Sequence, residues 1–352
     1  MKIAIVHDWI YRLSGSERVL MELHDMFPNA PIFTLFYNPD FLKKHFPDAD
    51  VRASFLQKFP LICSPLQKTY VPLMPSAVES FDFSGYDTVI SSSAVFSKGV
   101  IVSPGTRHIC YCYSPSRQLW DMHNNYSRFL AGRLITHFLR IWDKQAAGRV
   151  DEFAAISKNV KNRIAKYYGR EAKVIYPPLT LKSNAPISQG DFYLIVSRLY
   201  DYKNISIAID AFNKIKKPLV IVGDGPNRMK LSRIAKSNIK FTGHLSDDKI
   251  AEYYASCRAF VMPQEEDFGL TPVEAMSFGK PVLALKKGGA LEIIEKGVNG
   301  EFFDDPITEC LVDGIRRLDA NYPNYNPEKI KKSVKIFSRE KFRNDILELI
   351  NG

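Results

Sequence analysis

Short apolar segments alternate with amphipathic stretches along almost the whole chain. In the first half, the apolar runs typical of buried parallel strands cover residues 2–7, 32–36, 87–91, 108–113, 152–156 and 173–176. A second series covers residues 192–196, 219–222, 239–242, 259–262 and 281–285. The stretches between them have apolar residues at helical spacing, such as Val160 and Ile164 after Ser157, a residue type that favours a helix N-cap. This alternation predicts α/β architecture with parallel, doubly wound sheets.

The two series of strands are separated by Pro177-Pro178, a stiff and extended dipeptide typical of a linker. We therefore predict a first domain over residues 1–178 and a second domain over residues 179–337. The last stretch, 338–352, is amphipathic, and we expect it to form a helix that packs back on the first domain.

Composition limits the class of protein. The chain has 352 residues, of which 45% are hydrophobic and 24% charged, and this excludes wholesale disorder and fibrous repeats. No apolar run approaches the roughly 20 residues that a membrane-spanning helix needs. The five cysteines have no metal-type spacing, so we expect reduced thiols, no metal site and a cytoplasmic location.

The net charge is +10, from 48 Lys and Arg against 38 Asp and Glu. Most of the excess lies between Arg107 and Lys173, where 13 basic residues face 5 acidic ones, a net charge of +8. Nucleic acid, an anionic membrane surface or a phosphorylated substrate would each fit such a segment. A solvated face that serves solubility explains the same charge.

The most informative segment follows the predicted strand 259–262. Its loop holds Glu266 within a run of acidic residues, and Pro272 marks the first turn of the helix that comes next. Backbone N–H groups at a helix start bind phosphate or hydroxyl oxygens, and a carboxylate accepts hydrogen bonds from sugar hydroxyls. Glu266 in the loop and Glu274 in the helix could therefore contact one ligand. The alternative is that these acidic groups only complement the helix dipole.

Two cations, Arg198 and Lys203, follow the strand 192–196. Ligands of open α/β sheets bind at this edge, so the pair suits a diphosphate, unless the two cations form a surface ion pair with Asp201. Gly223 lies in a Gly-Asp-Gly-Pro segment after strand 219–222, where a tight turn and a nucleotide contact fit equally well.

The pair Glu266 and Glu274 resembles the E-x7-E motif of retaining glycosyltransferase family 4, and the resemblance extends over nearly the full chain. It is strongest to mannosyltransferases of O-antigen and capsular polysaccharide assembly. It implies the GT-B architecture, in which two Rossmann-like, doubly wound domains face a cleft. The first domain would then be the acceptor side and the second would bind the nucleotide sugar.

The resemblance also implies roles for individual residues. Glu266 would meet the donor sugar, Glu274 the ribose, and Arg198 with Lys203 the diphosphate and the charge of the leaving group. His244 would be a structural residue or pack on the base. The implied donor-binding residues are Gly15, Ser16, Arg198, Lys203, Gly223, His244, Leu245, Glu266, Phe268, Gly269, Leu270, Thr271 and Glu274.

In the first domain, Tyr111–Arg117 resembles a Y-C-H-T-P-x-R segment of the same family, with Tyr113 at the place of a histidine that often contributes to catalysis. Tyr113 either hydrogen-bonds the sugar or is only an aromatic residue at a strand end. Arg117, Trp120 and His123 follow and suit an acceptor phosphate and a sugar face, although scattered surface residues are nearly as good an interpretation.

The resulting hypothesis is a retaining, metal-independent hexosyltransferase without a cofactor. It would move a hexose, with mannose and GDP-mannose favoured, from a nucleotide sugar to a polyprenyl-diphosphate-linked saccharide in cell-surface polysaccharide synthesis. A sugar-nucleotide epimerase or hydrolase on the same fold is the alternative, and a nucleic-acid-binding protein is a poorer one.

The apolar, lysine-containing stretch 52–83 is either a membrane-interface face or a pair of core helices. With the basic segment, it predicts a peripheral location on the inner face of a bacterial membrane.

Overall fold

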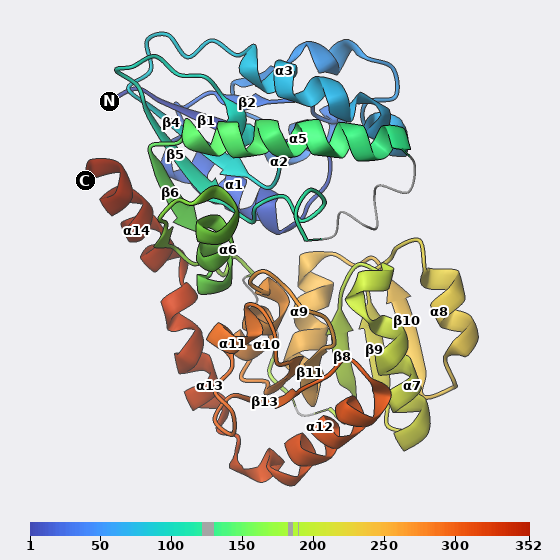
Figure 1. Cartoon of the computed structure of the whole chain (residues 1–352). Coiled ribbons are helices and arrows are strands. Elements are labelled where there is room, and N and C mark those ends of the chain that lie inside the picture. Colours follow the sequence, from blue (N-terminus) through green and yellow to red (C-terminus); the bar gives the residue numbers. More distant parts are fainter. Residues whose placement is uncertain (122–129, 182–185, 189) are drawn as a thin grey trace. The chain divides into compact units, whose positions relative to one another are not determined.

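The computed structural model describes residues 1–121, 130–181, 186–188 and 190–352, and it divides into two compact units (Figure 1). Unit 1 contains Met1–Pro178 together with Arg339–Gly352. Unit 2 contains Leu179–Ser338. Each unit has its own parallel sheet with helices on it, and the two units are described separately below.

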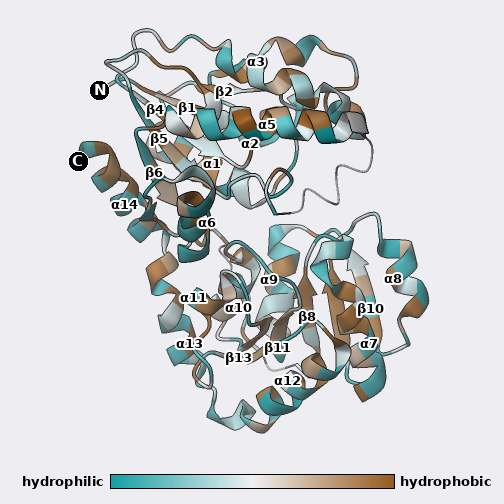
Figure 2. Cartoon of the chain, viewed as in Figure 1, coloured by the Kyte–Doolittle hydropathy of each residue, from teal (hydrophilic) through white to brown (hydrophobic). Residues whose placement is uncertain are grey.

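Unit 1 is built on a seven-stranded sheet in the order β3-β2-β1-β4-β5-β6-β7, with all neighbours parallel. The strands are β1 (Ile3–His7), β2 (Ile32–Thr34), β3 (Val51–Ala53), β4 (Thr88–Ser93), β5 (Arg107–Cys112), β6 (Glu152–Ala155) and β7 (Lys173–Val174). The central strands are buried along nearly their whole length because helices cover both faces. Figure 2 shows the same contrast between hydrophobic strands and the hydrophilic sides of the helices.

The helices of unit 1 are α1 (Gly15–Met26), α2 (Pro39–His45), α3 (Met74–Glu79), α5 (Leu130–Gly148), α6 (Lys158–Tyr168) and α14 (Arg339–Asn351). Three 3-10 segments add to them: η1 (Phe55–Lys58), η2 (Pro65–Leu73) and η3 (Ser97–Gly99). The end of the chain belongs to this unit because α14 is tied to α1 and β5. Arg339 Nε donates to Glu22 Oε2 at 2.6 Å, Arg343 pairs with the same carboxylate, and Arg107 donates to the Ile350 carbonyl at 2.7 Å.

Helix α6 shows how local sequence sets an element's limits. The Ser157 hydroxyl accepts from the Val160 N–H at 3.0 Å, so the predicted N-cap is confirmed. Gly169 ends the helix with φ 66°, a left-handed conformation that glycine adopts without a steric penalty. Val160 and Ile164 are buried, which accounts for the apolar spacing.

A fully buried ion pair lies inside unit 1. Lys98 Nζ is 2.5 Å from Asp143 Oδ1, and Lys98 also donates to the Val95 carbonyl at 2.6 Å. The other carboxylate oxygen accepts from the Trp120 indole at 2.7 Å and from the Tyr168 hydroxyl at 2.9 Å. Burial favours the neutral amine, but the Asp143 charge outweighs this effect and raises the pKa of Lys98. The pair therefore fastens α5 to the loop after β4.

Unit 2 has a six-stranded parallel sheet in the order β10-β9-β8-β11-β12-β13. Its strands are β8 (Tyr193–Val196), β9 (Leu219–Val222), β10 (Ile239–Gly243), β11 (Ala259–Met262), β12 (Val282–Leu285) and β13 (Gly300–Phe303). Its helices are α7 (Ile205–Ile215), α8 (Arg228–Ile234), α9 (Asp247–Ser256), α10 (Leu270–Ser277), α11 (Ala290–Ile293), α12 (Thr308–Ala320) and α13 (Pro327–Ser333), with 3-10 segments η4 (Asp201–Lys203), η5 (Tyr322–Asn324) and η6 (Val334–Phe337).

The chain order of this sheet reverses between β8 and β11. From β8 the chain runs outward to β9 and β10, and it then returns to add β11 on the other side of β8. In open α/β sheets, ligands bind at the carboxyl ends of the two strands that flank such a reversal. The sheet order therefore predicts a ligand site formed by the residues after Val196 and after Met262.

A buried histidine gives unit 1 an expected dependence on pH. Burial lowers the pKa of His108 to about 4, from 6.5 for an unperturbed histidine. Between these two values the unfolded chain binds a proton that the folded chain does not, so the free energy of unfolding falls as the pH falls. We expect His108 to contribute a loss of about 2 kcal/mol between pH 7 and pH 5.

Urea unfolding of the parent and of His108→Gln at both pH values measures this loss. The variant should lose about 2 kcal/mol less than the parent over this interval, and His137→Gln, a change at an exposed histidine of α5, should behave like the parent. Equal losses in the parent and in His108→Gln would contradict the prediction.

Candidate functional site

A lysine and a glutamate from the segments that follow β8 and β11 contact each other. Lys203, at the end of η4, forms an ion pair with Glu266 Oε1. The lysine side chain is almost completely buried, and its ammonium lies 4.9 Å from the centre of the Tyr202 ring. The alternative pairing with Asp201 is wrong for this lysine, since Asp201 instead accepts from the Asn227 side-chain amide at 2.8 Å. The ion pair thus joins two predicted site residues that are 63 positions apart.

Two further side chains, which sequence reasoning missed, fix this contact. Buried Gln264 donates from Nε2 to Glu266 Oε1 at 3.0 Å. Asn204 donates from its side-chain amide to the Pro263 carbonyl at 3.2 Å, and it has a left-handed backbone with φ 54°. The signal in the sequence was an asparagine directly after a predicted cation, because asparagine is among the few residues that adopt a left-handed backbone readily.

The loop that carries Glu266 is also held by the Gly288-Gly289 segment. The Gly289 N–H donates to the Glu266 carbonyl at 2.9 Å. A Cβ atom on Gly288 would lie 2.2 Å from the Glu266 carbonyl oxygen, and one on Gly289 would lie 2.2 Å from the Phe268 carbonyl oxygen. Both positions therefore require glycine for close packing. The pair of glycines acts on the site through the backbone of the loop.

Helix α10 begins directly after this loop. Gly269 is its N-cap residue, with φ 110° and no side-chain hydrogen bond to the first turn. The predicted residues Leu270 and Thr271 are the first two residues of the helix, and buried Phe268 precedes the cap. The helix, with the partial positive charge of its N-terminus, thus starts four residues after Glu266.

Glu274 is buried in α10. Its Oε2 accepts a hydrogen bond from the Tyr254 hydroxyl of α9 at 2.8 Å. Sequence reasoning missed Tyr254, which lies at a helical position where an aromatic residue is expected for the core. The hydrogen bond fixes the orientation of the carboxylate, because one of its oxygens is held by a buried partner.

Arg198 lies at the surface, two residues after β8. Its guanidinium lies 5.7 Å from the centre of the Tyr200 ring and donates to the Tyr202 hydroxyl at 3.3 Å. Tyr202 therefore contacts both predicted cations, Arg198 and Lys203. The two cations and Glu266 are the part of the predicted donor site that the contacts bring together.

The remaining predicted residues of unit 2 lie after the neighbouring strands. Gly223 follows β9, and its N–H donates to the Gly243 carbonyl at the end of β10 at 2.9 Å. Exposed His244 and half-buried Leu245 come directly after β10. These residues share the carboxyl edge of the sheet with Arg198. Their contact with a nucleotide is a prediction.

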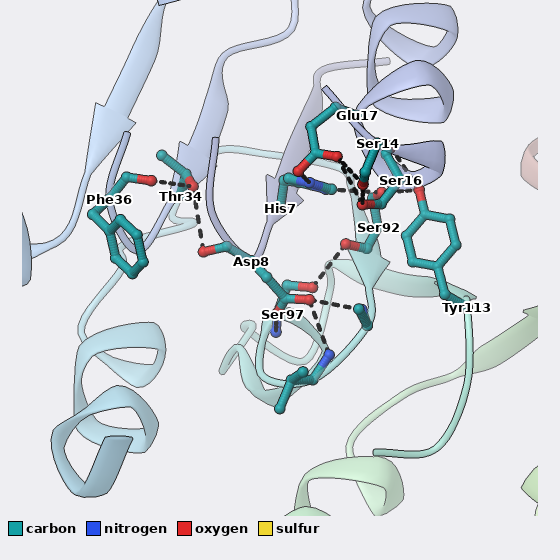
Figure 3. A network of polar contacts seen from close by, with 12 residues as sticks. His7, Asp8, Ser14, Ser16, Glu17, Thr34, Phe36, Ser92, Ser97 and Tyr113 are labelled. Carbon is teal, nitrogen blue, oxygen red and sulfur yellow. Dashed lines mark hydrogen bonds and ion pairs between the residues drawn. The ribbon is translucent and has the colours of Figure 1, made fainter. Parts of the chain in front are cut away.

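In unit 1, the predicted residues Ser16 and Tyr113 are brought together (Figure 3). The Tyr113 hydroxyl donates to the Ser16 carbonyl at 3.1 Å and lies 2.7 Å from the Ser92 hydroxyl. Ser92 in turn lies 3.0 Å from His7 Nδ1. Burial raises the pKa of Tyr113 well above its ordinary value, so the phenol stays protonated at neutral pH. These contacts tie the first turn of α1, which begins at Gly15, to β4.

The same network contains a buried carboxylate. Glu17 accepts hydrogen bonds from the Ser14 hydroxyl and, at 3.1 Å, from the Ser16 hydroxyl, and its other oxygen lies 3.9 Å from His7 Nε2. Burial disfavours its charged form, but the contacts with His7 and Ser14 outweigh burial and lower the pKa of Glu17. Next to it, both carboxylate oxygens of Asp8 accept backbone N–H groups of residues 94–97 at 2.7–2.9 Å.

The predicted acceptor residues Arg117 and Trp120 follow β5 in unit 1. The Trp120 indole donates to buried Asp143, and its ring stacks on Tyr167 with 5.0 Å between the ring centres. Arg117 is half-buried three residues before Trp120. His123 lies outside the described residues. Roles for these residues in acceptor binding stay predictions.

Within residues 1–121, 130–181, 186–188 and 190–352, no group of three or more His, Cys, Asp and Glu residues could hold a metal ion. In the same part of the chain, no helix is both long and apolar enough to cross a membrane.

Comparison with known proteins finds a family match within unit 2. Residues 180–335 match the family model described as glycosyl transferases group 1. An uncharacterized glycosyltransferase of Methanocaldococcus jannaschii is 31% identical over 200 residues, which cover 55% of each chain. The O-antigen chain mannosyltransferase C of Escherichia coli is 32% identical over 146 residues, which cover 39% of each chain. The match thus spans 55% and 39% of the length of these two curated relatives.

A solved structure matches the whole fold. The HepE protein of Anabaena, crystallised in complex with UDP-glucose, superposes with a TM-score of 0.74 at 22% identity and with complete coverage of both chains. Together with the two parallel sheets, this confirms the predicted fold of two Rossmann-like, doubly wound domains. The resemblance stated from the sequence agrees with these findings, since residues 180–335 match the glycosyl transferases group 1 model and a mannosyltransferase is among the relatives.

Proposed function

We propose that this protein is a retaining glycosyltransferase that moves a hexose from a nucleotide-diphosphate sugar to a lipid-linked saccharide. The observation that carries the proposal is the Lys203–Glu266 pair, which joins the segments after β8 and β11 shortly before the N-terminus of α10. A buried cation, an oriented carboxylate and a helix N-terminus supply the three groups that a diphosphate joined to a sugar needs.

In the proposed reaction, a hydroxyl oxygen of the acceptor forms a bond to the anomeric carbon of the donor sugar. The bond from that carbon to the diphosphate oxygen breaks, and the diphosphate leaves with the electron pair. The acceptor hydroxyl loses its proton to the departing phosphate on the same face, so the configuration is retained. Lys203, Arg198 and the N–H groups of Phe268–Thr271 stabilise the charge that develops on the diphosphate. This step requires no metal and no cofactor.

Glu266 and Glu274 have separate roles in this proposal. Glu266 accepts hydrogen bonds from the sugar hydroxyls, and Glu274, held by Tyr254, accepts them from the ribose. Gly223, His244 and the residues near them line the nucleotide side of the same sheet edge.

We favour mannose as the sugar and GDP-mannose as the donor. The similarity to the mannosyltransferase of Escherichia coli supports the sugar, and its role in an O-antigen chain supports a saccharide acceptor for cell-surface polysaccharide. HepE was crystallised with UDP-glucose, so a uridine donor is the comparison that any test must include.

The acceptor is proposed to be polyprenyl-diphosphate-linked, and the protein is proposed to act at the inner face of a bacterial membrane. The net charge of +8 between Arg107 and Lys173 supports both the anionic acceptor and the membrane location. This segment lies in unit 1, whereas the Glu266 loop proposed for the donor lies in unit 2. We assign Arg117, Trp120 and His123 to the acceptor, and Gly15, Ser16 and Tyr113 to the donor sugar and diphosphate.

A thermal-shift panel tests the proposal. GDP-mannose and GDP should raise the melting temperature more than UDP-glucose, UDP or an ADP-sugar, because a ligand that binds only the folded state stabilises it by mass action. The rise in melting temperature should persist in EDTA. It should be lost in the double variant Glu266→Ala/Lys203→Met. No shift with any nucleotide or nucleotide sugar would overturn the proposed donor site.

A further inference from the structure

Helix α5 exposes large apolar side chains along one side. Leu134 and Phe138 are 54% and 67% exposed, and Ile135 and Ile141 are also exposed. Residues at positions i, i+4 and i+7 of a helix share one face, so Leu134, Phe138 and Ile141 form a continuous apolar strip. Figure 2 shows hydrophobic segments along α5.

The core of unit 1 does not account for this strip. The opposite side of α5 contributes the buried residues Leu139, Asp143, Ala146 and Ala147. These residues pack on η3 and on the loop after β4, so the helix would need only that side apolar. Packing on the core therefore explains the buried side of α5 and leaves the outer apolar strip unexplained.

A basic strip runs beside the apolar one. Arg133, His137 and Lys144 are exposed, and the spacing places them about a quarter-turn to a half-turn away from Phe138 on the same outer side. Asp143 is the single acidic residue between Leu130 and Gly148, and it is fully buried against Lys98. The outer side of α5 thus carries positive charge without negative charge.

The segment before α3 continues the same character. Residues 51–78 contain no Asp or Glu. Leu56 and Ile62 are buried in the core, while Leu61 and Leu66 are exposed together with the flanking Lys58 and Lys68. The buried residues support the interpretation of this stretch as core packing. The exposed leucines and lysines support its interpretation as a membrane-interface face.

Helices α3 and α5 lie side by side (Figure 1). The Trp142 indole of α5 donates to Glu79 at the end of α3 at 2.8 Å, and Trp142 packs on the core that contains Val78. The exposed apolar residues before α3 and those of α5 thus belong to neighbouring elements of unit 1.

We propose that the outer side of α5 binds the surface of an anionic lipid bilayer. Leu134, Phe138 and Ile141 would enter the boundary between headgroups and acyl chains, and Arg133 with Lys144 would contact lipid phosphates. This inference specifies the membrane partner of the proposed function and rests on it for its biological role. Lipid binding itself is measured without any transfer reaction.

The charge favours a bilayer over a second copy of the chain. A two-fold symmetric dimer through this side would bring the same basic strip of both copies together. Such like-charge contacts are unfavourable, whereas an anionic bilayer attracts the strip at every orientation about the membrane normal.

The experiment is sedimentation of the full chain with vesicles of phosphatidylcholine alone and with an equal part of phosphatidylglycerol. The parent should bind the mixed vesicles and bind them less at high salt. Leu134→Gln/Phe138→Gln should lower the partition coefficient by about tenfold or more, because two apolar side chains no longer enter the interface. Arg133→Gln/Lys144→Gln should lower it by about tenfold on mixed vesicles and leave binding to neutral vesicles unchanged.

Matched changes elsewhere serve as controls. Ile101 and Ile307 are 52% and 49% exposed, and Ile101→Gln/Ile307→Gln should bind as the parent does. Lys236→Gln/Lys240→Gln removes two exposed lysines of unit 2 and should also have no effect. Parental binding by Leu134→Gln/Phe138→Gln, or no binding of the parent to mixed vesicles, would overturn the proposal.

Two further measurements separate the outcomes. If light scattering shows a dimer that the Leu134→Gln/Phe138→Gln change dissociates, with no vesicle binding by the parent, the strip is a contact between copies and the proposal is wrong. Nucleotide thermal shifts of the α5 variants should equal those of the parent. Vesicle binding without any nucleotide shift would contradict the proposed transferase and leave the lipid surface supported.

Discussion

Lys203→Met should lower the rate of sugar transfer by about 10²–10³-fold, the loss typical when one preorganised group that stabilises developing negative charge is removed. The ammonium of Lys203 is buried and held by Glu266 and the Tyr202 ring, so it is in place before a substrate arrives. The measurement is release of the nucleoside diphosphate at saturating donor, with circular dichroism and the melting temperature as checks of folding.

A double-mutant cycle with Glu266 separates a catalytic role from a structural one. If Lys203 serves only to neutralise Glu266, Glu266→Gln should restore activity to Lys203→Met, because the uncompensated charge is gone. We expect no restoration, since each group is proposed to contact a different part of the donor. Lys217, whose Nζ lies 2.5 Å from Asp319 outside the site, provides the control, and Lys217→Met should keep transfer within about twofold of the parent. Parental activity of Lys203→Met would refute its role.

Lys98→Met should lower the free energy of unfolding by about 3–5 kcal/mol, because it leaves the Asp143 carboxylate buried without its cation. Since the folded pKa of Lys98 is raised, the stabilisation is complete below the unfolded pKa and is lost only as the pH rises through the folded value. At neutral pH the full effect should therefore be seen in urea or thermal unfolding.

The partner change tests the cause of this loss. Lys98→Met/Asp143→Asn should recover most of the stability, because no buried charge remains and the amide oxygen can still accept from Trp120 or Tyr168. Arg52→Met, which removes an exposed ion pair with Asp50, should cost less than about 1 kcal/mol. A double variant as unstable as Lys98→Met would show that packing, and not charge, is responsible.

Much of the fold follows from the alternation of apolar and amphipathic segments. The predicted strand at residues 219–222 coincides with β9, and that at 259–262 coincides with β11. Two strands escaped prediction. β3 has only three residues, none of them buried, and β13 begins with Gly300 and contains Glu301, which β-propensity disfavours. Both lie at sheet edges, where a neighbouring strand supplies the order that the local sequence lacks.

Helix α5 was the largest helix that the sequence analysis did not predict. It is amphipathic, with Leu139, Asp143, Ala146 and Ala147 buried on one side, so its local periodicity does indicate a helix. The exposed residues Leu134, Phe138 and Ile141 add apolar side chains on the outer side, where polar residues are more usual.

The candidate site was partly accessible from sequence. Glu266 and Lys203 were named because each follows a strand that ends at one sheet edge, but their direct contact depends on β8 and β11 being neighbours, which only the sheet order gives. Gln264 and Tyr254 were missed because neither belongs to a recognisable motif. Each of them acts through the side chain of another residue. Their contribution is to orient the two carboxylates.

Calorimetric titration of the nucleotides from the thermal-shift panel tests the central claim most directly. We predict that one nucleoside diphosphate binds the parent in a one-to-one complex, and that Arg198→Gln and Lys203→Met each weaken this binding by about tenfold or more. Binding of equal strength in the parent and in both variants, or no heat with any nucleotide, would contradict a donor site at the carboxyl ends of β8 and β11.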